Sequence, residues 1–284
     1  MNKKVPEHIW SNSDFPYMCL KDIERTVAFQ KVIDSTVRSG DVVIDVGSGS
    51  GILALFAARA GASKVYAVEI DHMLCEALRK TICANGLESI IEVVEEDVML
   101  AELPYSDVLI AEIIETGLMD EMQAPVINSL WRKKTIDSNT KIIPSKYKTH
   151  IQLVNCDNTY YGFQILAPKH EWPFYKSGQK EGWFPTEIIE VGEKIQIAEY
   201  DFQKGQVELS LNVVVDVEIK PGQTANAIRM SGEITLCDGV ILGATNALNG
   251  DKILSINELA AGKHRLVFSN TLGNGLGALT IDTT

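Results

Sequence analysis

Cysteines are few in this sequence, and long apolar runs are absent. The five cysteines are scattered and form no Cys-x-x-Cys pair, so their spacing indicates neither a disulfide framework nor a zinc site. The N-terminal residues MNKKVPEHIW lack the apolar core of a signal peptide, and no apolar run approaches the roughly 18 residues that span a membrane. We therefore expect a cytoplasmic protein that holds no metal and binds no membrane.

Positive charge is also scarce. The 284 residues include 26 Lys and Arg against 38 Asp and Glu, which gives a formal net charge of -12. Nucleic acids and anionic membranes bind basic surfaces, so this balance argues against both as general partners and favours a basic partner. Hydrophobic residues make up 45% of the chain, which is enough for a sizeable core, and the length suggests two domains.

The most informative stretch is Asp41–Asp71, with the sequence DVVIDVGSGSGILALFAARAGASKVYAVEID. An apolar, β-branched run is followed by a glycine cluster, an Ala- and Leu-rich run, and a second apolar strand that ends in Glu69. This order predicts a strand, a glycine loop, a helix and a parallel strand of an α/β sheet. Ile52 occupies the place of the last glycine in a dinucleotide fingerprint, so the loop disfavours NAD.

The glycine loop predicts a nucleoside ligand. Gly47, Gly49 and Gly51 let the backbone approach a ligand closely, and the amides at the start of the following helix favour negative charge or carbonyl oxygens. Glu69 follows the loop by about 20 residues, where an acid usually accepts hydrogen bonds from the hydroxyls of a ribose. We therefore expect Glu69 to hold the ribose of a nucleoside.

The pattern of helices and strands continues on both sides of this unit. Charged residues separate Leu20, Ile23, Val27 and Val37, which predicts one amphipathic helix over 20–38. The pattern predicts further helices up to Ala60 and from His72 to Ala84, and strands over Ile90–Val94 and Asp107–Ala111. Three successive strands end in acidic residues, namely Glu69, Glu95 to Asp97, and Glu112. In open α/β sheets the ligand crevice lies at these carboxyl ends.

The pattern changes after about Thr140. Residues Gln206–Pro221 read QVELSLNVVVDVEIKP, in which apolar residues alternate with mostly polar ones. A period of two indicates a half-buried strand, and no helix of comparable strength follows. We predict an N-terminal α/β domain over residues 1–143 and a mostly antiparallel β domain over 144–284, either a barrel or a sandwich.

Two glutamates, Glu112 and Glu121, stand nine residues apart around a short apolar loop. This spacing is similar to the double-glutamate loop of protein arginine methyltransferases. The segment LKDIERT (20–26) resembles that family's LKD-x-x-RT helix, and VIDVGSGSGILALFAARAGASKVYAVE resembles its cofactor motif. The resemblance implies a Rossmann-like methyltransferase domain followed by a β-barrel, S-adenosylmethionine as cofactor, and a protein or peptide arginine as methyl acceptor.

The resemblance also implies roles for individual residues. Arg25 matches the arginine that holds the cofactor's carboxylate, and Asp97 and Val98 stand where the family contacts adenine. Glu112 and Glu121 are the implied catalytic pair. The full set of implied cofactor-binding residues is Arg25, Asp45, Gly47, Ser48, Gly49, Gly51, Glu69, Ile70, Asp97 and Val98.

Two carboxylates suit methyl transfer to arginine for a physical reason. A guanidinium has a pKa above 12, so the acceptor nitrogen needs alignment with the methyl group more than it needs a base. A carboxylate pair can clamp the guanidinium and draw its positive charge toward the other nitrogens. The alternative is that Glu115, Asp120 and Glu121 form a solvated acidic loop.

The C-terminal half departs from the family. Its Thr-His-Trp loop, which lines the substrate pocket, is absent, and the expected region reads GATNALNGDK. The aromatic motif before the LKD helix is reduced to Trp10, Phe15 and Tyr17. The family dimerises through an arm inserted in the barrel, and residues 170–185 are a short candidate for such an arm. Two alternatives therefore stay open: methylation of a small molecule or another nucleophile, and a catalytically silent binding module.

Overall fold

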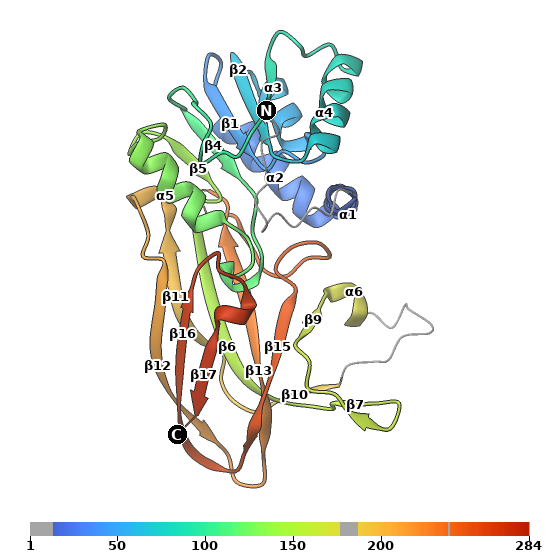
Figure 1. The fold of residues 1–284 in the computed structure, drawn as a ribbon, viewed down its shortest axis with the longest axis vertical. Helices are drawn as coiled ribbons and strands as arrows, with labels where there is room; N and C mark the ends of the chain where they lie inside the picture. The colour runs from blue at the N-terminus through green and yellow to red at the C-terminus, as the bar shows by residue number, and fades with distance from the viewer. Residues whose placement is uncertain (1–13, 177–186, 238, 284) are drawn as a thin grey trace, which may run out of the picture.

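The computed structural model describes residues 14–176, 187–237 and 239–283. The first half contains a five-stranded parallel sheet in the order β3-β2-β1-β4-β5 (Figure 1). Its strands are β1 Val42–Val46, β2 Lys64–Glu69, β3 Ile91–Glu95, β4 Val108–Ala111 and β5 Lys141–Ile143. The predicted α/β sheet is therefore present. The ends of β1 to β4 agree with the expected ones to within one residue, whereas β5 was not predicted.

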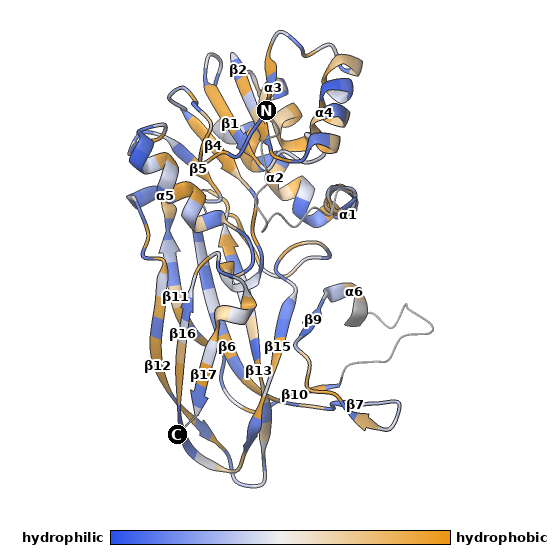
Figure 2. Ribbon diagram, in the orientation of Figure 1, coloured by the Kyte–Doolittle hydropathy of each residue, from blue (hydrophilic) through white to orange (hydrophobic). Residues whose placement is uncertain are grey.

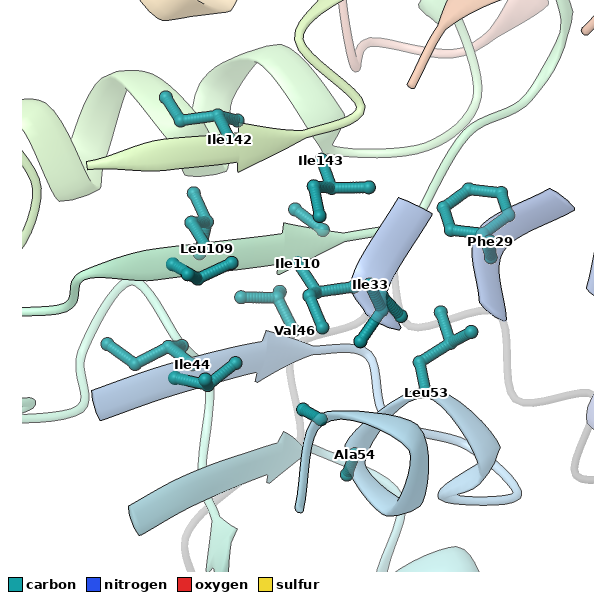
Figure 3. Packing of buried hydrophobic residues seen from close by; sticks show 14 of the residues in the cluster. Phe29, Ile33, Ile44, Val46, Leu53, Ala54, Leu109, Ile110, Ile142 and Ile143 are labelled. Carbon is teal, nitrogen blue, oxygen red and sulfur yellow. The ribbon is translucent and has the colours of Figure 1, made fainter. Parts of the chain in front are cut away.

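Helices accompany these strands, namely α1 Phe15–Lys21, α2 Ile23–Thr36, α3 Ile52–Ala60, α4 His72–Ala84 and α5 Gln123–Lys133. α1 and α2 precede the first strand, α3, α4 and α5 connect later ones, and α1 packs on α2 with none of its own residues buried. Phe29 and Ile33 of α2 meet Leu53 and Ala54 of α3 against the central strands, as Figure 3 shows. β1 and β4 bury almost every side chain, because helices cover parallel strands on both faces.

The predicted single helix over 20–38 is wrong, because the chain breaks at Asp22. The Asp22 carboxylate accepts a hydrogen bond from the Arg25 amide at 3.2 Å and so starts a new helix, α2. The expected apolar face is also mostly wrong. Leu20, Ile23 and Val27 are exposed, whereas the buried face consists of Phe29, Val32, Ile33 and Val37.

The second half is mostly antiparallel β, as expected. A seven-stranded sheet runs in the order β10-β6-β13-β15-β9, with β11 paired to β6 and β14 to β13, and a three-stranded sheet runs β12-β16-β17. The strands are β6 Lys146–Cys156, β7 Thr159–Tyr160, β8 Phe163–Gln164, β9 Lys169–Glu171, β10 Ile188–Glu190, β11 Ile195–Asp201, β12 Ser210–Ile219, β13 Ala225–Thr235, β14 Ile241–Leu242, β15 Asp251–Leu259, β16 Gly262–Thr271 and β17 Thr280–Thr283.

The two antiparallel sheets share one apolar core. Ile228 and Leu254 of the larger sheet lie in the same buried cluster as Leu211, Leu266 and Phe268 of the smaller sheet. Across the described residues, no strand pairing closes the two sheets into a barrel. Both expected architectures, the barrel and the sandwich, stay predictions. The strand expected over Gln206–Pro221 is β12, which begins at Ser210 and keeps the predicted alternation.

The two halves meet at a cis peptide bond between Ile143 and Pro144. The parallel sheet ends at Ile143, and β6 begins three residues later. The buried cluster of the first half continues into the second through Tyr147, Phe202 and Leu236. A continuous core therefore fixes the β half against the α/β half, while the domain limits 1–143 and 144–284 stay predictions.

Some expectations fall outside the described part. Trp10 and residues 177–185 of the candidate arm belong to the residues that the structure does not describe. In the described ranges no helix is long and apolar enough to cross a membrane. The same ranges contain no cluster of His, Cys, Asp and Glu arranged to hold a metal ion.

Candidate active site

The site lies at the carboxyl edge of the parallel sheet. Because β1, β2 and β4 run in the same direction, the glycine loop after β1, Glu69 at the end of β2 and Glu112 after β4 reach the same edge. Tight packing shapes the loop: Gly47 has φ +66°, and a Cβ there would lie 2.5 Å from Cγ2 of Ile113. Only glycine fits at this position without displacing the start of the double-glutamate loop.

Glu69 fixes the position of the glycine loop through hydrogen bonds from backbone amides. Its Oε2 accepts a hydrogen bond from the Gly49 amide at 2.9 Å, and its Oε1 accepts from the Ile70 and Asp71 amides at 2.8 and 2.9 Å. The side chain is buried. Each carboxylate oxygen can accept more than one hydrogen bond, so Glu69 can position the loop and bind a ribose at once. Its ribose contact stays a prediction.

Asp45 lies on β1 just before the same loop, and Ser48 lies within the loop. The Ser48 hydroxyl donates to the Asp45 backbone carbonyl at 3.0 Å. Asp45 is almost fully buried, and this burial raises the pKa of its carboxyl to about 7. Its Oδ2 has no hydrogen-bond partner among the described residues. The pKa of Asp45 therefore shifts when a charged group is placed near the loop.

Asp97 and Val98 lie in the turn after β3 and not in the strand itself. The Asp97 side chain accepts a hydrogen bond from the Met99 amide at 2.8 Å, and Val98 is buried. The side chain thus stabilises its own turn. Their predicted contact with adenine is neither supported nor opposed by these contacts.

Arg25 links the cofactor side of the site to the substrate side. The buried guanidinium donates through Nη2 to Glu112, while Nε and Nη1 are buried with no acceptor in the described part of the chain. A buried guanidinium with unused donors favours a planar anion such as a carboxylate. The donor set of Arg25 therefore fits the carboxylate of S-adenosylmethionine.

Glu121 has the opposite surroundings. It is part-buried, and no described residue donates a hydrogen bond or forms an ion pair with it. Burial, and then the negative charge of Asp120, raise the pKa of Glu121 to about 7, while Arg25 and Lys252 act in the opposite direction. Glu115 is also part-buried, and only Asp120 is exposed. The loop is therefore more than a solvated acidic segment.

The β half holds the double-glutamate loop in place, which sequence reasoning missed. The Thr116 hydroxyl donates to the Gly250 carbonyl at 2.6 Å, and the Gly117 amide donates to the Tyr147 hydroxyl at 2.8 Å. Tyr147 is fully buried and donates in turn to Asn249 at 3.1 Å. These contacts join residues that are between 30 and 134 positions apart, so no local pattern could indicate them.

The segment GATNALNGDK does face the site, although it lacks the Thr-His-Trp sequence. Thr245 donates its hydroxyl to Asp22 Oδ2 at 2.6 Å, and the Ala247 amide donates to the same oxygen at 2.7 Å. Asp22 directly precedes the helix that carries Arg25. The segment in the place of the family's loop thus fixes the N-terminus of α2, the helix that carries Arg25. It does so through the Thr245 hydroxyl and the Ala247 backbone amide.

Comparison with known proteins identifies the class. The sequence profile of the family described as Ribosomal protein L11 methyltransferase (PrmA) matches residues 17–172, more than half of the chain. The chain belongs to this family of methyltransferases and is of the arginine-methyltransferase-like type. Its cofactor is S-adenosylmethionine.

Individual proteins and one solved structure are also similar to this chain. An uncharacterized protein of Methanocaldococcus jannaschii is 31% identical over 94% of this chain and 95% of its own length. An arginine N(omega)-methyltransferase of Streptomyces achromogenes subsp. streptozoticus is 27% identical over 78% of this chain, which spans 65% of that protein. The Trypanosoma brucei PRMT1 enzyme-prozyme heterotetrameric complex with AdoHcy has the same fold, with a TM-score of 0.68, 19% identity, and coverage of 95% of this chain and 98% of that one.

Proposed function

We propose that this protein transfers a methyl group from S-adenosylmethionine to a guanidinium nitrogen of a protein or peptide arginine. The observation that carries the proposal is Glu121, an acid near the Arg25–Glu112 ion pair that has no cationic partner among the described residues. A part-buried carboxylate with a raised pKa is stabilised when a cation binds next to it. A guanidinium, which stays charged and offers several N–H donors, meets this requirement.

The residues divide the work between them. Arg25 would hold the cofactor's carboxylate through Nε and Nη1 while it keeps Glu112 fixed. The cofactor, when bound, supplies a methyl group on a positively charged sulfur. Glu112 and Glu121 would accept hydrogen bonds from the guanidinium, hold it in place and draw its positive charge away from the nitrogen that is methylated.

A small molecule with a guanidinium group is the second candidate substrate. The Streptomyces relative bears the name arginine N(omega)-methyltransferase and matches 78% of this chain. In addition, Ala247 stands in the segment where a bulky tryptophan was expected, so the substrate side differs from the protein arginine methyltransferases. The chemistry at Glu112 and Glu121 would be the same for both substrates.

The test uses purified protein with labelled S-adenosylmethionine and three acceptors: free arginine, an arginine-rich peptide, and the same peptide with lysine in place of arginine. Mass spectrometry should find methylarginine in one of the first two reactions and no product in the third. Methylation of lysine, or cofactor binding without any methylated guanidinium, would overturn the proposal. Comparing the first two acceptors decides between peptide and small-molecule substrates.

We also propose that two copies associate through the hairpin of β7 and β8. This hairpin projects from the β half (Figure 1), and part of its ribbon has the colour of hydrophobic residues (Figure 2). Tyr161 and Phe163 of this hairpin are 83% and 70% exposed, and Leu166 just after it is 65% exposed. Large apolar side chains exposed within a short segment are typical of an interaction surface. The hairpin immediately precedes the predicted arm. Light scattering should give a dimer that Phe163→Ser weakens; a wild-type monomer would contradict the proposal.

A further inference from the structure

We propose that Lys252 is a positioning residue for methyl transfer, because its buried ammonium joins the two ends of the double-glutamate loop and so fixes Glu112 relative to Glu121. The proposal rests on the function proposed above, since it gives Lys252 a role in the same reaction. Neither the resemblance nor the loop sequence points to this lysine.

The backbone of Lys252 is held on both sides. It lies on β15, which has β13 on one side and β9 on the other, and it stands opposite Met230 of β13 and His170 of β9. The residue is only 4% exposed. A strand with two hydrogen-bonded neighbours gives its side chain a fixed origin, so the ammonium reaches the loop from a rigid base.

The ammonium contacts an acid near each end of the loop. Nζ lies 2.6 Å from Asp120 Oδ2 and forms an ion pair with Glu115. The second oxygen of Asp120 accepts a hydrogen bond from the Leu276 amide at 2.7 Å, and the Asp120 amide points to Glu115 Oε2 at 3.4 Å. These contacts connect Glu115 to Asp120 across the loop, and they also attach Asp120 to the β half.

These two acids are close neighbours of the catalytic pair in the chain. Glu115 follows Glu112 by three residues, and Asp120 directly precedes Glu121. Between them the backbone adopts left-handed conformations, with φ +84° at Gly117 and φ +56° at Leu118. A non-glycine residue in this region is strained. The loop therefore depends on outside contacts to keep its shape, and Lys252 supplies the charged ones.

The distribution of charge supports a functional role. Lys252 pairs with Glu115 and Asp120, and Arg25 pairs with Glu112, so within the described part Glu121 is the loop acid left for a cationic guest. A buried ion pair is a poor way to gain stability, because apolar residues of the same shape often serve as well or better. What the lysine offers instead is a fixed geometry.

The first test compares Lys252→Met with Lys169→Met. Lys169 is a part-buried lysine on β9 that contacts Asn158 and lies 3.3 Å from Cys156, away from the loop. Lys252→Met should lower kcat by roughly 10-fold to 100-fold, the scale of a small misplacement of catalytic groups, and leave S-adenosylhomocysteine affinity unchanged. Lys169→Met should change neither. Equal kcat in both variants would overturn the proposal.

A second variant separates positioning from folding. Lys252→Met alone leaves Glu115 buried without a cation, which destabilises the protein. The triple variant Lys252→Met, Glu115→Gln, Asp120→Asn removes all three charges and should regain melting temperature while kcat stays low. Recovery of kcat together with melting temperature would show that Lys252 acts only on stability and would overturn the proposal.

A third measurement does not depend on the substrate. Hydrogen exchange of residues 112–121 should be faster in Lys252→Met than in wild type, and unchanged in Lys169→Met. If wild type methylates no guanidinium, the proposed function fails, whatever the exchange. If wild type is active and Lys252→Met matches it in both rate and exchange, the function stands and the role of Lys252 is refuted.

Discussion

Glu69 and Glu121 stand at the same edge of the sheet in opposite states. Glu69 accepts hydrogen bonds from three backbone amides and fixes the glycine loop before any ligand binds. Glu121 receives none from the described residues, and its pKa is raised to about 7 by burial. The glycine loop is therefore fixed before any ligand binds, whereas Glu121 gains a counter-charge only from a cationic guest.

The largest expected effect is on the substrate side. Glu121→Gln keeps the shape of the side chain but removes the charge that orients a guanidinium. We expect kcat to fall by roughly 100-fold or more, the scale of losing one preorganised electrostatic contact, while cofactor affinity changes little. Glu95→Gln is the matched control, because Glu95 is an exposed acid at the end of β3 that pairs with His72 and Arg79. Near-normal turnover of Glu121→Gln would leave the fold and cofactor intact and remove the arginine mechanism.

The corresponding substitution at Glu112 should affect the cofactor side as well as the substrate side. Glu112 pairs with Arg25, so Glu112→Gln disturbs the group that is expected to hold the cofactor's carboxylate. Both turnover and cofactor affinity should fall in that variant. The two glutamates of the pair are therefore distinguishable, and only Glu121 isolates the substrate side.

The next effect is on the cofactor side. Glu69→Ala removes the acceptor for the Gly49, Ile70 and Asp71 amides and for the expected ribose hydroxyls. Each lost charge-assisted hydrogen bond costs about 1.5–3 kcal/mol, so calorimetry should show S-adenosylhomocysteine binding at least tenfold weaker. Unchanged affinity would mean that Glu69 neither binds the ribose nor needs to hold the loop.

Arg25→Lys should have a smaller and more selective effect. Lysine keeps the positive charge but loses the planar set of donors that serves Glu112 and a carboxylate together. S-adenosylhomocysteine should bind about tenfold more weakly, equivalent to about 1.4 kcal/mol, and adenosine, which has no carboxylate, should bind as before. An equal loss for both ligands would make Arg25 a structural residue.

The smallest expected effect is on the pH dependence of stability. Burial raises the pKa of the carboxyl groups of Asp45, Glu115 and Glu121 to about 7. Between their ordinary pKa, about 4, and 7, the folded protein binds protons that the unfolded chain does not. The stability of the cofactor-free protein should therefore fall as pH rises through this window.

Glu121→Gln removes one of these three carboxyl groups. Urea unfolding at pH 5 and pH 8 should show the variant gaining on wild type by roughly 1–2 kcal/mol between the two values. An equal difference at both pH values would mean that Glu121 is ionised in the folded state over the whole range.

Local patterns in the sequence determined the α/β half and most of its site. The apolar runs, the glycine cluster and the acids at strand ends predicted the parallel sheet and the edge at which Gly47, Glu69 and Glu112 meet, because strand direction follows from the strand-helix-strand order. The same reasoning failed at Asp22, where the capping of a new helix outweighed an amphipathic pattern.

Tertiary structure alone decided how the double-glutamate loop is held. Tyr147, Asn249 and Lys252 are distant from the loop in sequence, and their partners depend on how the β half packs against the sheet. One signal was visible: Lys252 precedes Ile253 and Leu254 in a strand pattern, and a charge at a buried position needs a partner. The identity of that partner is a property of the packed core, because burial both creates the need for a counter-charge and determines which acid is within reach.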